Sequence, residues 1–416
     1  MNRANRWLPA RPLPAQAFWP GVSPARPELR SPEPIDRPSD EWLFDEAYLF
    51  GVDLYEAQFP WEAHEAWEGA WKLASELARR MLLQGLIQCT AAVVKARAGA
   101  AAGARSLVVR GARRLERAAE LYGAPDVMGL HIPRFVDELR AWTSAGDLAP
   151  EARPLLSLAV RSRDRLASLT DLRVRAADTE VTRRAEGLAL RTPARPDFHD
   201  GHLLMLDAPP SPDTIDAQLA ACREAVGEHP GRPLSLCWEV GAGASSPAIP
   251  NAEPLAVLRL PDHEVAAEAR PPPEGVVLRS IGERETEPLI ALAIDVHGGR
   301  EDFHRWRVVA LRDRLAGSGG MWGAFRGERL IGSLGLFESP TLLRFQEVLT
   351  RADERGKGVA TSLVATALRA ARARHPRAIA VIVAEPESQA ERIYQRLGFR
   401  RAGTQYWLRS STREAT

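Results

Sequence analysis

Cysteine is scarce in this sequence. Only three occur among 416 residues, Cys89, Cys222 and Cys237, which are too few for a disulfide framework and too scattered for a zinc site. Such cysteine usage is typical of a reduced compartment, and we expect a cytoplasmic protein.

An excess of charge of one sign and long apolar runs are also missing. The 55 Lys and Arg residues are balanced by 54 Asp and Glu, for a formal net charge of +1, which argues against nonspecific nucleic-acid binding. No run is long and apolar enough to span a bilayer. The first forty residues contain nine prolines and lack the apolar core of a signal peptide. We expect no nucleic-acid or membrane partner and interpret residues 1–37 as a flexible tail.

A chain of this length holds two or three domains. From Glu41 onward, apolar residues recur at helical spacing. This periodicity predicts an all-α helical bundle over residues 38–150, followed by a helical linker at 151–174. The expected helices are 41–58, 61–77, 79–99, 102–122 and 131–142.

One of these helices carries a histidine and two carboxylates close together. His64 and Glu68 are four residues apart and share a helix face, with Glu65 beside them. The group could bind a divalent metal, or an amine or amide ligand. The HExxH pattern of zinc hydrolases is absent, however, and no second histidine stands at ligand spacing. We therefore predict no metal site and interpret the group as structural, satisfied by Gln84 or Gln88 of the next helix.

Two strings in this region carry a family resemblance. They are EAHEAWE at 62–68 and LQGLIQ at 83–88, the second followed by small apolar residues. They resemble the small helical family catalogued as domain of unknown function 309, over about residues 42–122. The resemblance implies a helical fold and leaves the role open, because that family has no settled activity.

Residues 175–270 show mixed periodicity. Strands are predicted at 185–192, 201–207 and 233–240, and a helix at 213–228, which indicates an α+β domain. We interpret 193–199 as a surface loop, with contact to a neighbouring active site as the alternative. Residues 241–250 are predicted to form a flexible loop, and the prolines at 271–273 a stiff linker.

The string RGKGVA at 355–360 is the most informative about function. It stands between a strand-like run, FQEVLT at 345–350, and a helix-like run at 361–374. At a helix N-terminus the first amides lack partners and the dipole favours anions. Gly356 and Gly358 let the backbone approach a ligand closely, while Arg355 and Lys357 add positive charge. The turn is therefore predicted to bind a pyrophosphate.

The flanking periodicity indicates an α/β domain. Strands are expected at 276–280, 321–325, 330–337, 378–384 and 406–409, and further helices at 283–296, 303–316 and 388–397. The last of these helices ends in the string YQRLGF at 394–399, in which Gly398 is the expected C-cap.

RGKGVA and YQRLGF together resemble the GNAT N-acetyltransferase superfamily, in which an Arg/Gln-x-x-Gly-x-Gly/Ala pattern binds acetyl-CoA. The resemblance covers about residues 275–412 and implies an α/β GNAT fold with a mixed central sheet. It also implies acetyl transfer from acetyl-CoA to an amine, without a metal or a covalent acyl-enzyme. The layout of 175–270 resembles a degenerate GNAT-like half of a tandem member. No glycine-rich turn follows its strands, so no cofactor is expected there.

The resemblance also implies roles for single residues. Tyr394 would donate a proton to the departing thiolate. Glu347 is the candidate general base, although strand alternation sends it and Gln346 to opposite faces; a water chain is the alternative. Substrate contacts are expected from the helices around 297–316. The expected cofactor-binding residues are Val348, Leu349, Thr350, Arg355, Gly356, Lys357, Gly358, Val359 and Ala360. The substrate candidates are His297, Asp302, Phe303 and Trp306.

Three functions follow as hypotheses. The first is an acetyl-CoA-dependent N-acetyltransferase with a fused helical accessory domain, acting by direct attack of a primary amine on a small molecule or peptide. The second is a catalytically inactive acyl-CoA-binding regulator. The third is a bifunctional protein whose helical domain binds a metal or small ligand. The sequence leaves open the identity of the amine, the general base and the oligomeric state.

Overall fold

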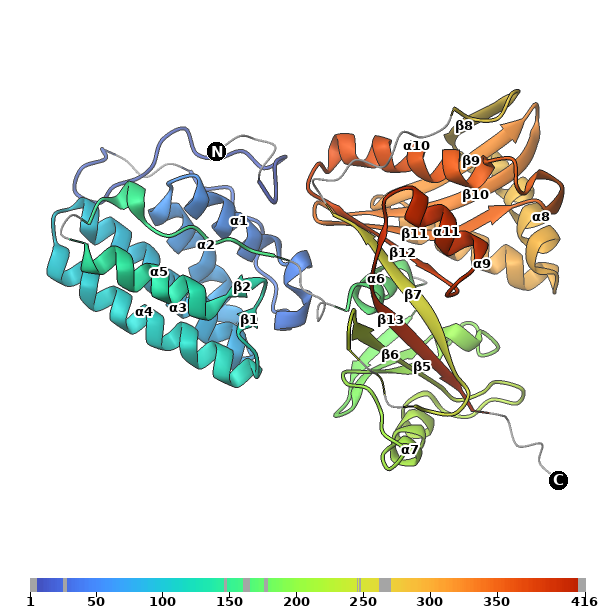
Figure 1. The fold of residues 1–416 in the computed structure, drawn as a ribbon, viewed down its shortest axis with the longest axis horizontal. Coiled ribbons are helices and arrows are strands. Elements are labelled where there is room, and N and C mark those ends of the chain that lie inside the picture. Colours follow the sequence, from blue (N-terminus) through green and yellow to red (C-terminus); the bar gives the residue numbers. More distant parts are fainter. Residues whose placement is uncertain are drawn as a thin grey trace. The chain divides into compact units, whose positions relative to one another are not determined.

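The structure is a computed structural model, and its chain divides into two compact units, Met1–Arg161 and Ser162–Thr416 (Figure 1). The residues that it describes are 6–24, 28–145, 148–159, 165–175, 179–244, 246, 248–261 and 271–410. Parts of the predicted tail, linker, loop and domains lie outside this description, namely 1–5, 25–27, 146–147, 160–164, 176–178, 245, 247, 262–270 and 411–416.

The first unit is a bundle of α-helices, which confirms the predicted helical region. Two short strands, β1 (Asp126–Val127) and β2 (Leu130–His131), form a hairpin between the last two helices. In Figure 1 the helices pack side by side. They are α1 (Glu46–Glu56), α2 (Pro60–Leu73), α3 (Leu77–Arg97), α4 (Ala101–Tyr122) and α5 (Ile132–Ser144).

Aromatic side chains fill the core of this bundle. Trp67 and Tyr48 are completely buried, and the indole Nε1 of Trp67 donates a hydrogen bond to the Tyr48 carbonyl oxygen at 3.0 Å. Gly51 lies against this indole, because a Cβ there would stand 2.2 Å from Nε1. A glycine is thus required for α1 and α2 to pack this closely.

The predicted flexible tail differs from the structure over residues 6–24. Trp7 and Leu8 are buried, and their backbone amides donate to the two carboxylate oxygens of Asp53 at 2.7 and 2.8 Å. Proline-rich composition suggested a solvated segment, but the apolar side chains and the buried carboxylate tie this stretch to the bundle.

The second unit is built on one sheet of 11 strands, in the order β3-β4-β5-β6-β13-β7-β12-β11-β10-β9-β8. The pairs β5–β6 and β11–β12 are parallel and the other pairs antiparallel, which confirms the predicted mixed sheet. The strands are β3 (Glu180–Arg183), β4 (Gly187–Arg191), β5 (Leu203–Leu206), β6 (Ser235–Gly241), β7 (Ala252–Leu260), β8 (Val276–Ser280), β9 (Gly319–Arg326), β10 (Arg329–Glu338), β11 (Leu342–Thr350), β12 (Ile379–Ala384) and β13 (Arg400–Arg409).

Helices cover both faces of this sheet. Leu334 and Leu336 of β10 belong to the core cluster that includes α10, whereas a Cβ on Gly335 would touch Leu311 and Leu315 of α9. Because successive strand residues point to opposite faces, α9 and α10 lie on opposite sides. The helices are α6 (Leu166–Val174), α7 (Ile215–Val226), α8 (Thr286–His297), α9 (Glu301–Leu315), α10 (Val359–Arg374) and α11 (Gln389–Arg396).

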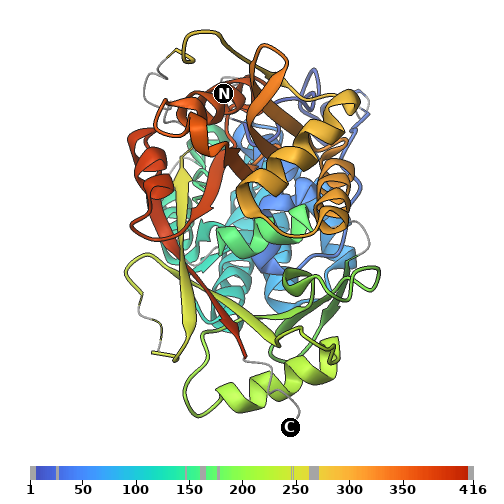
Figure 2. The ribbon, with the colours of Figure 1, turned by 90° about the vertical axis from the view of Figure 1, so that its right-hand side faces the viewer.

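Two strands cross between the halves of the sheet. β7 follows β6 in the chain but pairs with β12, and β13 follows α11 but pairs with β6; the two also pair with each other. Figures 1 and 2 show β7 (yellow) and β13 (red) running through the middle of the sheet. The predicted boundary between 175–270 and 275–412 thus falls within a single compact unit.

No helix in the described part of the chain combines the length and the hydropathy needed to cross a bilayer. The three cysteines are buried as free thiols.

Candidate active site

The turn at 355–360 leads directly into α10, as predicted. Gly356 and Gly358 have φ angles of +76° and +88°, which favour glycine, and Gly358 is the N-cap of the helix. A Cβ added at either position would meet no atom within 4 Å. The glycines are therefore required by backbone conformation, and the space beside them is open.

The amides of this turn form a row of free donors. From Gly356 to Thr361, no backbone N–H donates to any acceptor in the described part of the chain; Ser362 is the first to bond back, to the Gly358 oxygen at 3.0 Å. Lys357 Nζ contacts Glu354 at 3.3 Å, and Glu354 also forms a two-contact ion pair with Arg326 at 3.0 and 3.2 Å. These contacts anchor the turn while its amides remain available to an anion.

A cleft of about 660 Å³ opens in front of these amides. Its lining includes every predicted cofactor-binding residue, from Val348 to Thr350 and from Arg355 to Ala360, together with Tyr394 of α11. The structure thus brings together residues that are up to about forty-six positions apart in the sequence.

One wall of the cleft is a strand edge without a neighbour. β11 pairs with β12 only over Leu342–Arg344, although β11 continues to Thr350. On its other side Leu349 and Thr350 still pair with Ser333 and Gly332 of β10. The backbone groups of Val348–Thr350 that face away from β10 can therefore hydrogen-bond to an extended ligand as an added strand.

Tyr394 lies deep in the same cleft. Its side chain is 5% exposed and packs against Phe399, with ring centroids 6.3 Å apart. Burial raises the pKa of Tyr394 to about 12, so its phenol is protonated at neutral pH. It can therefore donate a hydrogen bond to a developing anion.

A β-bulge in β11 changes the expected direction of Glu347. Ser333 pairs with Leu349 while Gly335 pairs with Gln346, so Glu347 and Val348 together oppose one residue of β10. Glu347 has a φ angle of +47°. The prediction that Gln346 and Glu347 point to opposite faces is wrong, because both line a second cavity of about 280 Å³.

Glu347 is held as an anion by two neighbours. Burial by itself would raise its pKa, but the charge of Arg307 and hydrogen bonds from His297 and Arg307 outweigh burial and lower the pKa to about 2. The His297 Nε2 to Glu347 Oε2 distance is 3.5 Å, and Arg307 forms a short ion pair with Oε1. A carboxylate of such low pKa is a poor base but a good partner for a cation.

The 280 Å³ cavity has a wall of alternating charge. Among its lining residues, the buried pair Asp171 and Arg344 is joined at 2.8 Å, and Gln405 donates to Asp171 at 2.9 Å. Arg409 bridges Asp200 and Glu253 at 3.0 and 2.6 Å. Sequence reasoning missed these residues, because they come from five distant segments and carry no local motif.

The four predicted substrate residues have different surroundings. Trp306 lines the 280 Å³ cavity, and Phe303 packs against Trp306 with ring centroids 6.0 Å apart. His297 contacts Glu347, whereas Asp302 is exposed and pairs with Arg300 at 2.8 Å. Phe198, from the loop interpreted as ordinary surface, also lines the cavity, 4.9 Å from Trp306 between ring centroids.

The turn between β5 and α7, in the 175–270 region, is rich in proline. Between β5 and α7 the sequence is DAPPSPDT at 207–214, in which Pro209, Pro210 and Pro212 have no N–H. This turn lacks the continuous row of amides found at 356–361, and the absence of a cofactor there stays a prediction.

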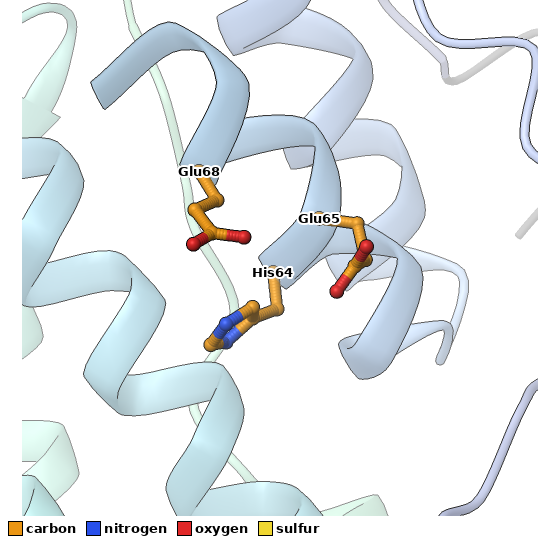
Figure 3. Close-up of side chains that lie close together, drawn as sticks. All are labelled: His64, Glu65 and Glu68. Atoms are coloured by element: carbon orange, nitrogen blue, oxygen red, sulfur yellow. The ribbon is translucent and has the colours of Figure 1, made fainter. Parts of the chain in front are cut away.

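On α2, His64, Glu65 and Glu68 come together, with ligand atoms within 4.8 Å of one another (Figure 3). The predicted stabilisation by Gln84 or Gln88 is not what the described contacts show. The side-chain oxygens of both glutamines accept from Arg114, at 2.8 and 3.0 Å. His64 instead contacts Thr90, and Glu65 is exposed.

Comparison with known families confirms both resemblances. Residues 48–107 match the model of the family described as Domain of unknown function (DUF309), and residues 287–399 match that of the Acetyltransferase (GNAT) family. The second match indicates acyl transfer as the chemistry of this part of the chain. No protein with a curated description matches the sequence.

Solved structures resemble the chain only distantly. A GCN5-related N-acetyltransferase from Kribbella flavida is 16% identical, with a TM-score of 0.46, covering 62% of this chain and 98% of its own. A functionally unknown conserved protein from Staphylococcus epidermidis is 10% identical, with a TM-score of 0.44, covering 57% and 95%. A tandem GNAT protein from the clavulanic acid biosynthesis pathway is 14% identical, with a TM-score of 0.39, covering 67% and 96%. With TM-scores below 0.5, these likenesses establish neither fold nor function.

Proposed function

We propose that this protein is an N-acetyltransferase that transfers the acetyl group of acetyl-CoA to a primary amine of a small molecule or peptide. The observation that carries the proposal is the row of free amides from Gly356 to Thr361, which faces the same cleft as the free edge of β11 and the phenol of Tyr394. Nucleic acid and membranes are not among the partners that we propose, and the cytoplasmic setting remains a prediction.

The residues of the cleft fit acetyl-CoA. The amides of the turn and the N-terminus of α10 would hold the pyrophosphate, with Arg355 and Lys357 adding charge. The backbone of Val348–Thr350 would pair with the amides of the pantetheine arm. When bound, acetyl-CoA supplies an acetyl group already activated as a thioester, so the protein need only position the amine, manage its proton and hydrogen-bond the departing sulfur.

The amine would enter from the 280 Å³ cavity. Adjacent residues of β11 line the two cavities, with Gln346 and Glu347 in one and Val348–Thr350 in the other. β11 pairs with β12 only as far as Arg344, so the sheet has a gap beside these residues, and we propose that the thioester and the amine meet there. Glu347 would bind the substrate as an ammonium ion. Because the pKa of Glu347 is low, its carboxylate is a poor base. We propose that a water molecule removes the proton from the ammonium ion instead.

We further propose that residues 175–270 are a degenerate second GNAT half. The same order of elements occurs twice, as β4-β5-α7-β6 and as β10-β11-α10-β12. In each, the first two strands pair antiparallel, a helix follows, and the second and third strands pair parallel. The strand that follows each set pairs with the other set: β7 follows β6 but pairs with β12, and β13 pairs with β6. Without a phosphate turn of its own, this half would contribute walls to the substrate cavity, through Phe198 and Glu253.

The proposal is tested by thiol release from acetyl-CoA with a panel of amino acids, polyamines, aminoglycosides and peptide N-termini. Acetyl-CoA binding is measured in parallel by calorimetry. We expect saturable binding, and turnover with at least one class of amine. Absence of acetyl-CoA binding would overturn the proposal.

A second candidate function is an acyl-CoA-binding regulator without catalytic activity. The low pKa of Glu347 favours it, because this carboxylate is then too weak a base to deprotonate an amine. Tight acetyl-CoA binding without thiol release on any amine would support this function. Such a result would leave the cofactor site intact and remove the catalytic part of the proposal.

A further inference from the structure

Helix α2 of the first unit carries three potential metal ligands on its surface. One ligand atom each from His64, Glu65 and Glu68 lies within 4.8 Å of the others. His64 and Glu68 are half-buried, and Glu65 is exposed, so the group is rigid on one side and accessible on the other. Figure 3 shows the three side chains leaving the same stretch of α2, with the imidazole near both carboxylates.

The contacts of His64 favour a free lone pair on Nε2. The Thr90 hydroxyl donates to the Ile87 carbonyl oxygen at 2.7 Å, so toward His64 Nδ1, at a long 3.5 Å, it can only accept. A proton on Nδ1 leaves Nε2 as the unprotonated nitrogen. The ring of Trp61 stacks on the imidazole, with centroids 5.9 Å apart and planes at 9°, which restricts its rotation. A metal-bound histidine is commonly oriented in this way by its other nitrogen.

The charges of the group are incompletely balanced. Glu68 contacts Lys72 at 3.3 Å, but Glu65 forms no ion pair with any residue in the described part of the chain. Two carboxylates at this separation repel each other unless a cation lies between them. Gln84 and Gln88 do not compensate, since their oxygens accept from Arg114.

A further polar group on the same face has no partner. The indole Nε1 of Trp71 is buried and has no hydrogen-bond acceptor among the described residues. Trp71 is three residues from Glu68 and seven from His64, which places it on the same side of the helix. This N–H is therefore available as a donor to a water or an anion on this side of α2.

We propose that His64, Glu65 and Glu68 bind one divalent transition-metal ion, with Zn²⁺ as the preferred ion. One imidazole nitrogen and two carboxylate oxygens form a borderline ligand set, which favours Zn²⁺ over Mn²⁺ and both over Mg²⁺ or Ca²⁺. Three protein ligands leave one coordination position of a tetrahedral metal ion open. This is the arrangement of catalytic zinc sites, whereas structural zinc sites have four protein ligands. The open position would accept water or an anionic or carbonyl-containing ligand.

The test uses the full chain without a histidine tag, stripped with a chelator and dialysed against Zn²⁺, Mn²⁺ or Mg²⁺. We expect about one equivalent of bound Zn²⁺ by elemental analysis. Glu68→Gln keeps the shape of the side chain and removes its charge, and His64→Ala removes the nitrogen. Each variant should weaken Zn²⁺ binding at least about tenfold. His131→Ala is the matched control, because His131 in the same unit contacts one carboxylate, Asp126 at 3.0 Å, and should leave the affinity unchanged.

Co²⁺ provides a second readout. Its visible spectrum changes when an imidazole ligand is lost, so His64→Ala should alter the bands while His131→Ala should not. Circular dichroism distinguishes loss of the site from unfolding, and Glu68→Gln remains informative if His64→Ala does not fold. Binding of less than half an equivalent of Zn²⁺, or equal loss of affinity in the His131→Ala control, would overturn the proposal.

Discussion

Two side chains at the candidate active site show how surroundings set chemical roles. Tyr394 is surrounded by apolar groups, and burial raises its pKa to about 12. For Glu347, burial is outweighed by Arg307 and His297, and the pKa falls to about 2. At neutral pH the phenol therefore keeps its proton and the carboxylate keeps its charge, which suits hydrogen-bond donation for Tyr394 and cation binding for Glu347.

The role of Tyr394 predicts the behaviour of Tyr394→Phe. Its ring should still pack against Phe399, so acetyl-CoA affinity should be unchanged. The value of kcat should fall about a hundredfold, because the departing thiolate loses its donor. In the native enzyme, the rate should not fall between pH 7 and 10 on account of this phenol, because its pKa is about 12. Thiol release at saturating acetyl-CoA measures both effects, and an unchanged kcat would contradict the role.

Glu347 should contribute to stability in a pH-dependent way. Its pKa is lowered in the folded protein from an ordinary value of 4.5 to about 2. Its contribution is therefore present above about pH 4.5 and is lost as the pH falls toward 2. Glu347→Gln should lower the urea midpoint at pH 7, and the difference from the native protein should shrink below pH 4.5. A difference that is constant from pH 7 to pH 3 would contradict the charge argument.

The turn before α10 works as an element rather than through one side chain. Its donors are main-chain amides, and its shape depends on two glycines with positive φ angles. Arg355 adds charge, but its Nε also contacts the Thr350 carbonyl oxygen at 3.2 Å. Loss of the Arg355 side chain should thus matter less than a change in the backbone.

This reasoning predicts different outcomes for Gly358→Val and Arg355→Ala. The first should abolish acetyl-CoA binding, because a branched side chain opposes a φ of +88° and its Cβ would project into the cleft. The second should weaken binding only several-fold. Calorimetry with acetyl-CoA measures both.

Gly317 provides a matched control for backbone strain. It has a φ of +84° and equally open surroundings, and does not line the 660 Å³ cleft. Gly317→Val should lower stability by about 1–2 kcal/mol, as any such change does, yet leave acetyl-CoA affinity intact. If Gly358→Val also left the affinity intact, the phosphate-binding interpretation would fail.

The pairing of β7 and β13 in the middle of the sheet determines the composition of the cavity that we propose for the substrate. Glu253 and Leu255 of β7 and Gln405 and Trp407 of β13 line it together with Phe198. Residues from both the 175–270 and the 275–412 regions thus line one cavity, and the proposed function would give the 175–270 region a role without a cofactor of its own.

Substitution of Phe198 tests this role. Phe198→Ala should raise the KM for the amine about tenfold, the effect of losing a large apolar contact, and leave acetyl-CoA affinity unchanged. Val181→Ala, at an exposed position of the edge strand β3, is the control and should change neither quantity. Steady-state kinetics at saturating acetyl-CoA measures the effect. An unchanged KM in Phe198→Ala would remove the 175–270 region from the substrate site.

Local patterns predicted most elements and the cofactor turn. Helix and strand periods are properties of neighbouring residues, so the predicted helix at 361–374 is observed at 359–374 and the predicted strand at 276–280 is observed at the same residues. Strand β7 was missed, although it contains a run of apolar residues. The β11 bulge was also missed, because it depends on pairing with β10 rather than on the sequence of β11.

Residue type and spacing were sufficient to predict a helical bundle, an α/β domain and a glycine turn at a helix N-terminus, since each rests on interactions within a few positions. The direction of Glu347, the burial of Trp7 and the membership of the substrate cavity depend on contacts between distant segments. The pairing of β7 with β13 brings Glu253 beside Arg409, and the periodicity of neighbouring residues does not predict such a long-range pairing. The site proposed for the amine therefore depends on long-range packing, whereas the site proposed for the cofactor was predicted from local sequence.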